Sequence, residues 1–178
     1  MHLCSLRMAG AGACIEAHAP LIEYLSWEER MNINTTHRTG VGPVMTIGDL
    51  QAFMKREFPQ LGDTFEITAI DDGSATMRLH ADEQHLRPGG TVSGPSLFAL
   101  ADVTAYAAIL AHIGPVALAV TTSLNINFLR KPSPGAIDAV AHLLKLGKRL
   151  AVLEISLTDA ANGELVAHAT ATYSIPPR

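Results

Sequence analysis

One carboxylate in this sequence has the surroundings that catalysis favours. Asp102 is the only Asp, Glu, Lys or Arg between Pro88 and Leu129. A carboxylate among apolar side chains is costly unless it is hydrogen-bonded or needed, and such surroundings strengthen it as a base. Asp102 could therefore activate water for attack on a carbonyl, or attack the carbonyl itself. The structural alternative is a buried helical Asp that bonds a neighbouring strand.

A second candidate, Gly94, stands eight residues before Asp102 at the start of the same apolar segment. If a helix begins there, its first backbone N–H groups have no intrahelical partner. Such donors stabilise the negative charge that develops on a carbonyl oxygen, and glycine lets a substrate approach the backbone closely. The alternative is that Ser93-Gly94 forms only a tight turn and a helix cap.

The composition excludes several classes of protein as the setting for Asp102 and Gly94. The chain has 178 residues, of which 48% are hydrophobic and 17% charged, with a net charge of −4. Soluble proteins average about 25% charged residues. The length suggests one main domain, and the high apolar content with low net charge argues against disorder. The slightly acidic balance, without a basic cluster, argues against nucleic-acid binding.

The apolar stretch from Leu97 to Val120 raises the question of a membrane span. It contains Asp102 and His112, and Gly114-Pro115 interrupts it. The uninterrupted helix-compatible piece of about 18 residues is marginal for a span, and an Asp in its first half would be costly in lipid. We therefore predict a buried central helix and no membrane partner.

Residues 1–44 differ from the rest of the chain. They hold both cysteines, Cys4 and Cys14, and show no sustained hydrophobic period. They also lack the basic start and apolar run of a secretory signal. We predict a poorly ordered N-terminal extension over 1–44 and a folded domain over 45–178. The domain has no cysteine, which excludes a disulfide framework or a Cys nucleophile within it and fits a cytoplasmic protein.

Local signals divide the domain into two helices and a run of strands. Helical spacing after Thr46 predicts a helix that ends at Pro59, and Asp72-Gly73 predicts a β-hairpin. Pro95 suits the start of the long helix and Gly114 its end. The predicted strands are 65–71, 74–80, 117–129, 136–146, 150–158 and 165–175, with 81–90 as a polar loop. One buried helix amid antiparallel strands is an α+β arrangement.

Three motifs carry a family resemblance. They are Arg87–Pro95 (RPGGTVSGP), Leu100–Asp102 (LAD) and Ser123–Phe128 (SLNINF). In order and spacing they resemble the motifs of hotdog-fold acyl-CoA thioesterases, above all the PaaI-like branch of the phenylacetate pathway. The resemblance covers about 45–176 in element order and 87–131 in motifs. It implies a hotdog fold, in which an antiparallel sheet wraps around one long central helix.

The same resemblance implies hydrolysis of an acyl-CoA thioester to free acid and CoA. Asp102 matches the family's catalytic acid and Gly94 its oxyanion-hole glycine, while Thr121 matches a hydroxyl that holds the attacking water. Ser93 stands where the family commonly has His, and Pro95 where it commonly has a second Gly. Ser93 can still hydrogen-bond a carbonyl or a water, although it cannot carry a proton as His does.

The family also implies an assembly and a cofactor requirement. The minimum unit would be a homodimer with sites at the subunit interface, where Asp102 serves the partner's site, and dimers of this family often pair to tetramers. No metal or redox cofactor is implied, since coenzyme A enters as part of the substrate.

Candidate substrate contacts lie on several segments. Coenzyme A carries phosphates, so cations should line the mouth of the site; the candidates are Arg87, Arg130, Lys131 and the turn Lys148-Arg149. A solvated loop charge is the alternative for each. Thr122 and Asn125 are candidate contacts on the strand after the helix; Thr122 has the alternative of a plain β-branched strand residue, and Asn125 that of a subunit contact. His80 and His85 lie in a loop without metal-site spacing.

Two rival functions remain open at this point. One is a non-catalytic acyl-CoA or lipid-binding module on the same fold, which Ser93 in place of His makes credible. The other is a hotdog hydratase, which is disfavoured because no His stands at the helix start to pair with the acid. Thiol release from acyl-CoA esters would separate the thioesterase from the binding module.

Overall fold

The computed structural model describes residues 42–177, so most of the predicted extension over 1–44 lies outside the described residues. Two helices, two turns of 3-10 helix and eight strands follow one another in this part of the chain. Their bounds are α2 Ile47–Glu57, η3 Pro59–Leu61, β1 Phe65–Asp71, β2 Ser74–His80, η4 Glu83–His85, β3 Leu86–Arg87, β4 Thr91–Val92, α3 Gly94–Ile113, β5 Val120–Phe128, β6 Ala136–Leu146, β7 Leu150–Asp159 and β8 Leu165–Ser174.

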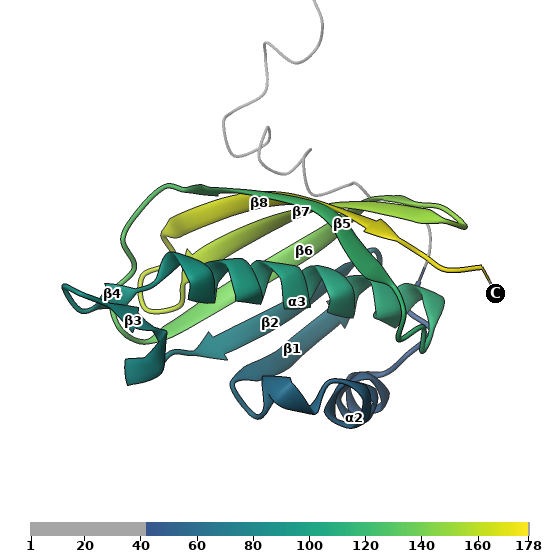
Figure 1. The fold of residues 1–178 in the computed structure, drawn as a ribbon, viewed down its shortest axis with the longest axis horizontal. Coiled ribbons are helices and arrows are strands. Elements are labelled where there is room, and N and C mark those ends of the chain that lie inside the picture. Colours follow the sequence, from purple (N-terminus) through teal and green to yellow (C-terminus); the bar gives the residue numbers. More distant parts are fainter. Residues whose placement is uncertain (1–41, 178) are drawn as a thin grey trace, which may run out of the picture. The chain divides into compact units, whose positions relative to one another are not determined.

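Six of the strands form one antiparallel sheet in the order β1-β2-β6-β7-β8-β5. The sheet curls around α3, which lies across its concave face, while α2 lies beside the β1 edge (Figure 1). The predicted α+β hotdog arrangement is therefore confirmed. Since β5 is the last strand at the other edge, the chain passes from β2 to that edge through β3, β4 and α3 before β5 pairs with β8.

The long helix begins and ends where its local signals predict. Ser93 is the N-cap, with Gly94 and Pro95 in the first turn, and Gly114 ends the helix with a φ of 85°, which glycine adopts readily. The helix is long and apolar enough to cross a membrane by length and composition, yet 67% of that window is buried within the described residues. It is the central helix of a protein core.

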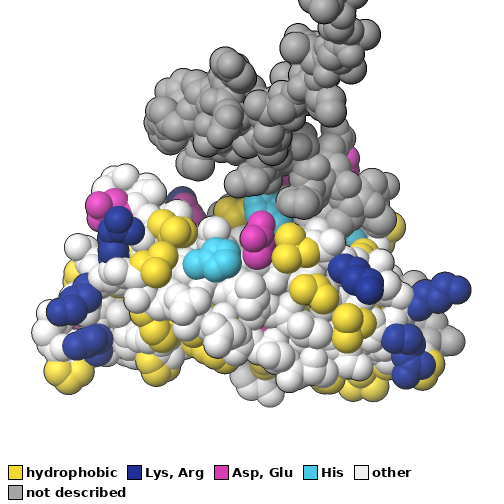
Figure 2. Space-filling model, turned by 90° about the horizontal axis from the view of Figure 1, so that it is seen from above, with side chains coloured by type: hydrophobic (Ala, Val, Ile, Leu, Met, Phe, Trp, Pro, Cys, Tyr) yellow, Lys and Arg dark blue, Asp and Glu magenta, His cyan; other side chains and the backbone are white. Residues whose placement is uncertain are grey.

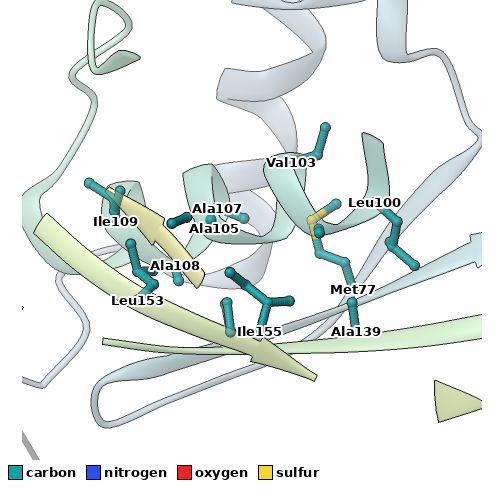
Figure 3. Close-up of a cluster of buried hydrophobic side chains, with 14 of the residues drawn as sticks. Met77, Leu100, Val103, Ala105, Ala107, Ala108, Ile109, Ala139, Leu153 and Ile155 are labelled. Carbon is teal, nitrogen blue, oxygen red and sulfur yellow. The ribbon is translucent and has the colours of Figure 1, made fainter. Parts of the chain in front are cut away.

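Small side chains let this helix approach the sheet closely. Ala105, Ala107 and Ala108 are fully buried on α3, and larger side chains from the sheet, such as Leu153 and Ile155, fill the space against it (Figure 3). The inward faces of β6, β7 and β8 alternate strictly with half-exposed outward residues over most of their length. This alternation decides which side chains of each strand face α3.

The local structure at α2 and at the β1–β2 turn agrees with the prediction, whereas the segment 81–90 differs from it. Thr46 and Asp49 form the capping box of α2, and the β1–β2 turn is tied to α3 because the Gly73 N–H donates to His112 Nε2 at 2.9 Å. The prediction of a plain loop over 81–90 was wrong: it holds η4 and β3. Strand β3 pairs with β4 around Gly89 and Gly90, both with positive φ.

Strand β5 contains a bulge that matters for the site. Thr121 pairs with Tyr173 and Ser123 with Thr172, so Thr122 is the extra residue. A bulge reverses the inside-outside alternation of a strand at that point. Thr121 and Leu124 consequently both face α3, which regular alternation could not achieve.

Candidate active site

Asp102 lies on the face of α3 that is turned toward strands β5 and β8. Its Oδ1 accepts a hydrogen bond from the Thr121 hydroxyl at 2.7 Å and another from the Tyr173 hydroxyl at 2.5 Å. The Tyr173 hydroxyl also lies 2.8 Å from the Asp102 backbone oxygen. The structure thus brings together Asp102 and Thr121, two of the residues that the sequence singled out.

The two oxygens of this carboxylate have different surroundings. Oδ1 takes both hydrogen bonds, whereas Oδ2 accepts none from any described residue, and the side chain as a whole is half-buried. The structural alternative from the sequence, a helical Asp that bonds neighbouring strands, therefore accounts for Oδ1 only. Oδ2 stays available to a water or a substrate.

Tyr173 is the site residue that sequence reasoning missed. It is 2% exposed, and burial together with the nearby Asp102 charge raises the pKa of its hydroxyl above the ordinary value. It therefore remains a hydrogen-bond donor at neutral pH. The available signal was its inward position in a predicted strand, but that position is equally typical of a core tyrosine.

The N-terminus of α3 offers one open backbone donor. Ser93 Oγ accepts from the Ser96 N–H at 3.3 Å and lies 2.8 Å from Ser96 Oγ, and Pro95 has no N–H. No acceptor for the Gly94 N–H is found among residues 42–177. The Ser93 hydroxyl serves as the helix cap, which was the alternative reading of this turn, while the Gly94 N–H remains free for a substrate oxygen.

Gly94 packs closely against β5. A Cβ added at this position would lie 3.3 Å from the Phe128 ring, so Gly94 is packed at the far end of the strand that begins near Thr121. Along α3, eight residues separate Gly94 from Asp102, or about 12 Å at the usual rise of a helix. One chain alone therefore does not place both groups on a single carbonyl.

The predicted substrate contacts fall into separate groups. Thr122, the bulge residue, donates its hydroxyl to the Thr172 backbone oxygen at 3.0 Å. Asn125 pairs with Thr170 on the outer face of the sheet, away from Asp102. Neither side chain lies beside Asp102 within one chain.

Most of the candidate cations lie near one or the other end of β5. Arg130 donates to the Leu165 backbone oxygen at 2.8 Å, next to exposed Lys131, at the Phe128 end. Arg149 lies at the other end, where its backbone oxygen accepts from the Ile175 N–H. Arg87 is exposed on β3, before the start of α3. In the face drawn in Figure 2, Lys and Arg side chains likewise lie toward the two ends.

Comparison with known proteins identifies the family. The model of the "Thioesterase superfamily" matches residues 89–166, which include α3 and its Asp102. The crystal structure of a "putative thioesterase" from Silicibacter sp. TM1040 is 51% identical, with a TM-score of 0.72, and the match covers 78% of this chain and 96% of that one. The chain belongs to the thioesterase superfamily.

Two more distant relatives carry more specific names. Human acyl-coenzyme A thioesterase 13 is 28% identical over 114 residues, which is 63% of this chain and 80% of that protein. A mutant structure of the phenylacetic acid degradation protein PaaI from Thermus thermophilus is 27% identical, with a TM-score of 0.59. That match covers 66% of this chain and 99% of the PaaI chain. PaaI-like proteins are thus among the structural neighbours.

Within this thioesterase-superfamily domain, two hollows lie away from Asp102. One, of about 680 Å³, lies between α2 and the β1–β2 hairpin, with Met54, Phe58 and Met77 in its lining. The other, of about 660 Å³, lies at the C-terminal end of α3 and includes Lys148 and Arg149.

Four of the five histidines within residues 42–177 pair with carboxylates or lie in the sheet, and the fifth, His112, lies on α3. His80 lies 2.8 Å from Glu66, and His85 lies 2.8 Å from Asp82. His168 lies on the outer face of β8. Within residues 42–177, no group of three or more His, Cys, Asp or Glu side chains could hold a metal ion.

Proposed function

We propose that this protein hydrolyses an acyl-CoA thioester to a free acid and CoA at a site shared by two copies of the chain. The observation that carries the proposal is the Asp102 carboxylate, whose Oδ1 is fixed by Thr121 and Tyr173 while Oδ2 is open. A fixed carboxylate with one free oxygen suits a general base. Membership of the thioesterase superfamily and the similarity to acyl-coenzyme A thioesterase 13 support the substrate class.

The β5 edge supports the homodimer. β5 has one neighbour in the sheet, β8, so its outer row of N–H and C=O groups has no strand partner within residues 42–177. It has no charged residue to discourage pairing with another strand. Large apolar side chains around it are exposed, among them Leu118 at 75% and Phe128 at 52%. A second copy that pairs antiparallel along this edge would cover them.

Such a dimer resolves the separation between Gly94 and Asp102. Gly94 packs against Phe128 at one end of β5, and Asp102 bonds Thr121 near the other end. A two-fold axis through the middle of the paired strands reverses one copy relative to the other. The Gly94 N–H of each chain would then approach Asp102 of the partner subunit. Two equivalent sites result, each with a donor from one chain and a base from the other.

The chemistry of each site follows from these two groups. Asp102 Oδ2 takes a proton from water, and the water oxygen forms a bond to the thioester carbonyl carbon. The carbonyl oxygen becomes an oxyanion that accepts from the Gly94 N–H. As the C–O double bond re-forms, the C–S bond breaks, and the proton on Asp102 passes to the departing sulfur to give CoA and the free acid. Direct attack by Oδ2 on the carbonyl carbon would instead break the C–S bond, release CoA as the thiolate and leave an acyl anhydride at Asp102, which water then hydrolyses to the free acid and the carboxylate.

The same pairing would bring the cations together. Arg130 and Lys131 lie at the Gly94 end of β5, and Arg149 lies at the Asp102 end. In an antiparallel pair, these ends meet across the two-fold axis. Each site would therefore have cations from both chains for the phosphates of CoA.

A panel of acyl-CoA esters with a thiol reporter tests the proposal. We expect thiol release from at least one ester, and Asp102→Asn should reduce kcat by about a hundredfold or more, in line with the contributions of general bases. Single-turnover hydrolysis in ¹⁸O-water would separate the two routes, since only direct attack places label in the Asp102 carboxylate.

One observation favours a second function, the acyl-CoA-binding module. The Ser93 hydroxyl is committed to the helix cap, so the α3 N-terminus has no side chain that could carry a proton. The absence of thiol release from every ester, together with a rise in Tm on addition of CoA, would support that function and overturn hydrolysis.

A further inference from the structure

Tyr173 connects the core of the domain directly to the candidate base. Its strand, β8, is the neighbour of β5, and its ring points from the sheet toward α3 as part of the hydrophobic core. At the end of that ring, the hydroxyl lies 2.5 Å from Asp102 Oδ1. The bond links the strand to the helix in the folded chain, 71 residues away in sequence.

The Tyr173 hydroxyl acts as the donor in this contact. Its single proton has two acceptors within reach, the Asp102 carboxylate at 2.5 Å and the backbone oxygen at 2.8 Å. Hydrogen bonds to an ionised acceptor are the shorter and stronger kind. The shorter separation, 2.5 Å, indicates that the carboxylate is the main acceptor of this hydrogen bond.

The two donors to Oδ1 differ in how firmly they are held. Thr121 is an exposed residue of the edge strand β5. Tyr173 is 2% exposed, and its hydroxyl position is set by a ring that the core encloses on all sides. The position of the carboxylate is therefore determined mainly by Tyr173 on β8.

We propose that Tyr173 is a positioning residue, which holds Asp102 Oδ1 so that Oδ2 faces the substrate. The proposal rests on the proposed function. Tyr173 touches no reacting atom; it restricts the rotation of the carboxylate through a buried hydrogen bond.

Tyr173→Phe tests the role, since it removes the hydroxyl and keeps the ring. We expect kcat to fall about ten- to a hundredfold, the range for a hydrogen bond to a charged group, with KM changed less than about twofold. Tyr106→Phe is the matched control, since it removes a hydroxyl that bonds the Ala117 backbone oxygen at 3.1 Å.

A merely structural tyrosine would give a different result. In that case Tyr173→Phe would lower Tm, while kcat would match that of the wild-type protein, and the proposal would be overturned. A loss of kcat in Tyr106→Phe as large as in Tyr173→Phe would overturn it as well, because the effect would then follow from any lost hydroxyl on this side of α3.

A measurement without turnover separates this proposal from the proposed function. The carboxyl ¹³C resonance of Asp102, assigned with Asp102→Asn, reports the hydrogen bonds to this carboxylate in the intact protein. At neutral pH we expect the resonance to move in Tyr173→Phe and to keep its position in Tyr106→Phe, because only Tyr173 donates to the carboxylate. If no acyl-CoA is hydrolysed, the proposed function fails, and the displaced resonance still supports the positioning role. Superimposable resonances in Tyr173→Phe and the wild-type protein would overturn that role whatever the activity.

Discussion

The shared site predicts that two inactive variants restore each other. Asp102→Asn removes the base from one set of sites, and Gly94→Pro removes the open N–H donor. Proline is tolerated in the first turn of a helix, and Ser93 already has the extended backbone, with ψ of 152°, that a residue before proline prefers. Gly94→Ala is the matched control, because it adds a similar Cβ 3.3 Å from Phe128 and keeps the N–H.

The expected size of the restoration follows from the pairing. Loss of one oxyanion donor costs about 10²- to 10³-fold in kcat, so Gly94→Pro homodimers should be nearly inactive, as should Asp102→Asn homodimers. In a heterodimer, one site has both wild-type groups and the other has neither. Random pairing of equal amounts makes half of the dimers mixed, so activity should reach about a quarter of the wild-type value in a two-fold dimer.

Co-expression with two different affinity tags gives the sharpest assay. Dimers purified through both tags should release thiol at about half the wild-type rate per dimer, because one of the two equivalent sites is intact. If such heterodimers are as inactive as either parent, Gly94 and Asp102 do not act across the interface, and the dimer geometry proposed here is wrong. The Gly94→Ala homodimer should remain active without a complementing partner, because its N–H donor is retained.

Three further predictions address the hydroxyl, the cations and the effect of pH. Thr121→Val should lower kcat about tenfold, through loss of its bond to Asp102, and unchanged kinetics would remove Thr121 from the site. Arg149→Ala should raise KM for acyl-CoA about tenfold and leave KM for the matching acyl N-acetylcysteamine ester unchanged, with Arg56→Ala on α2 as the control. Because the pKa of Tyr173 is raised above 10.0, the unfolded chain loses this proton first as pH rises. Stability should therefore fall above about pH 10, by roughly 1 kcal/mol per pH unit, and Tyr173→Phe should lack that part of the fall in denaturant titrations.

Elements with complete local signals were predictable from the sequence. The capping box of Thr46 and Asp49 and the hairpin at Asp72-Gly73 each depend on neighbouring residues. The central helix was predictable for the same reason, since Ser93, Pro95 and Gly114 mark its ends. Signals of this kind act over a few residues and need no knowledge of the rest of the fold.

Features that depend on distant pairing were not predictable in the same way. Strict alternation back from Leu124 would place Thr122 toward the helix, and only the bulge against β8 turns Thr121 there instead. The short β3–β4 pair was missed because two-residue strands lack a period to recognise. Tyr173 looks like any inward strand residue until the fold places its hydroxyl on Asp102.

The sequence by itself determined that one acid would lie in an apolar central helix, eight residues after a glycine at the helix start, because charge pattern and helix signals are properties of the chain. Only the tertiary structure decided which oxygen of that acid is open. The donors to Oδ1 come from β5 and β8, and strand pairing over long sequence separations sets their positions. The tertiary structure also decided that Gly94 and Asp102 lie near opposite ends of β5, an edge strand whose outer side has no partner among the described residues, which is why we expect a second copy to complete each site.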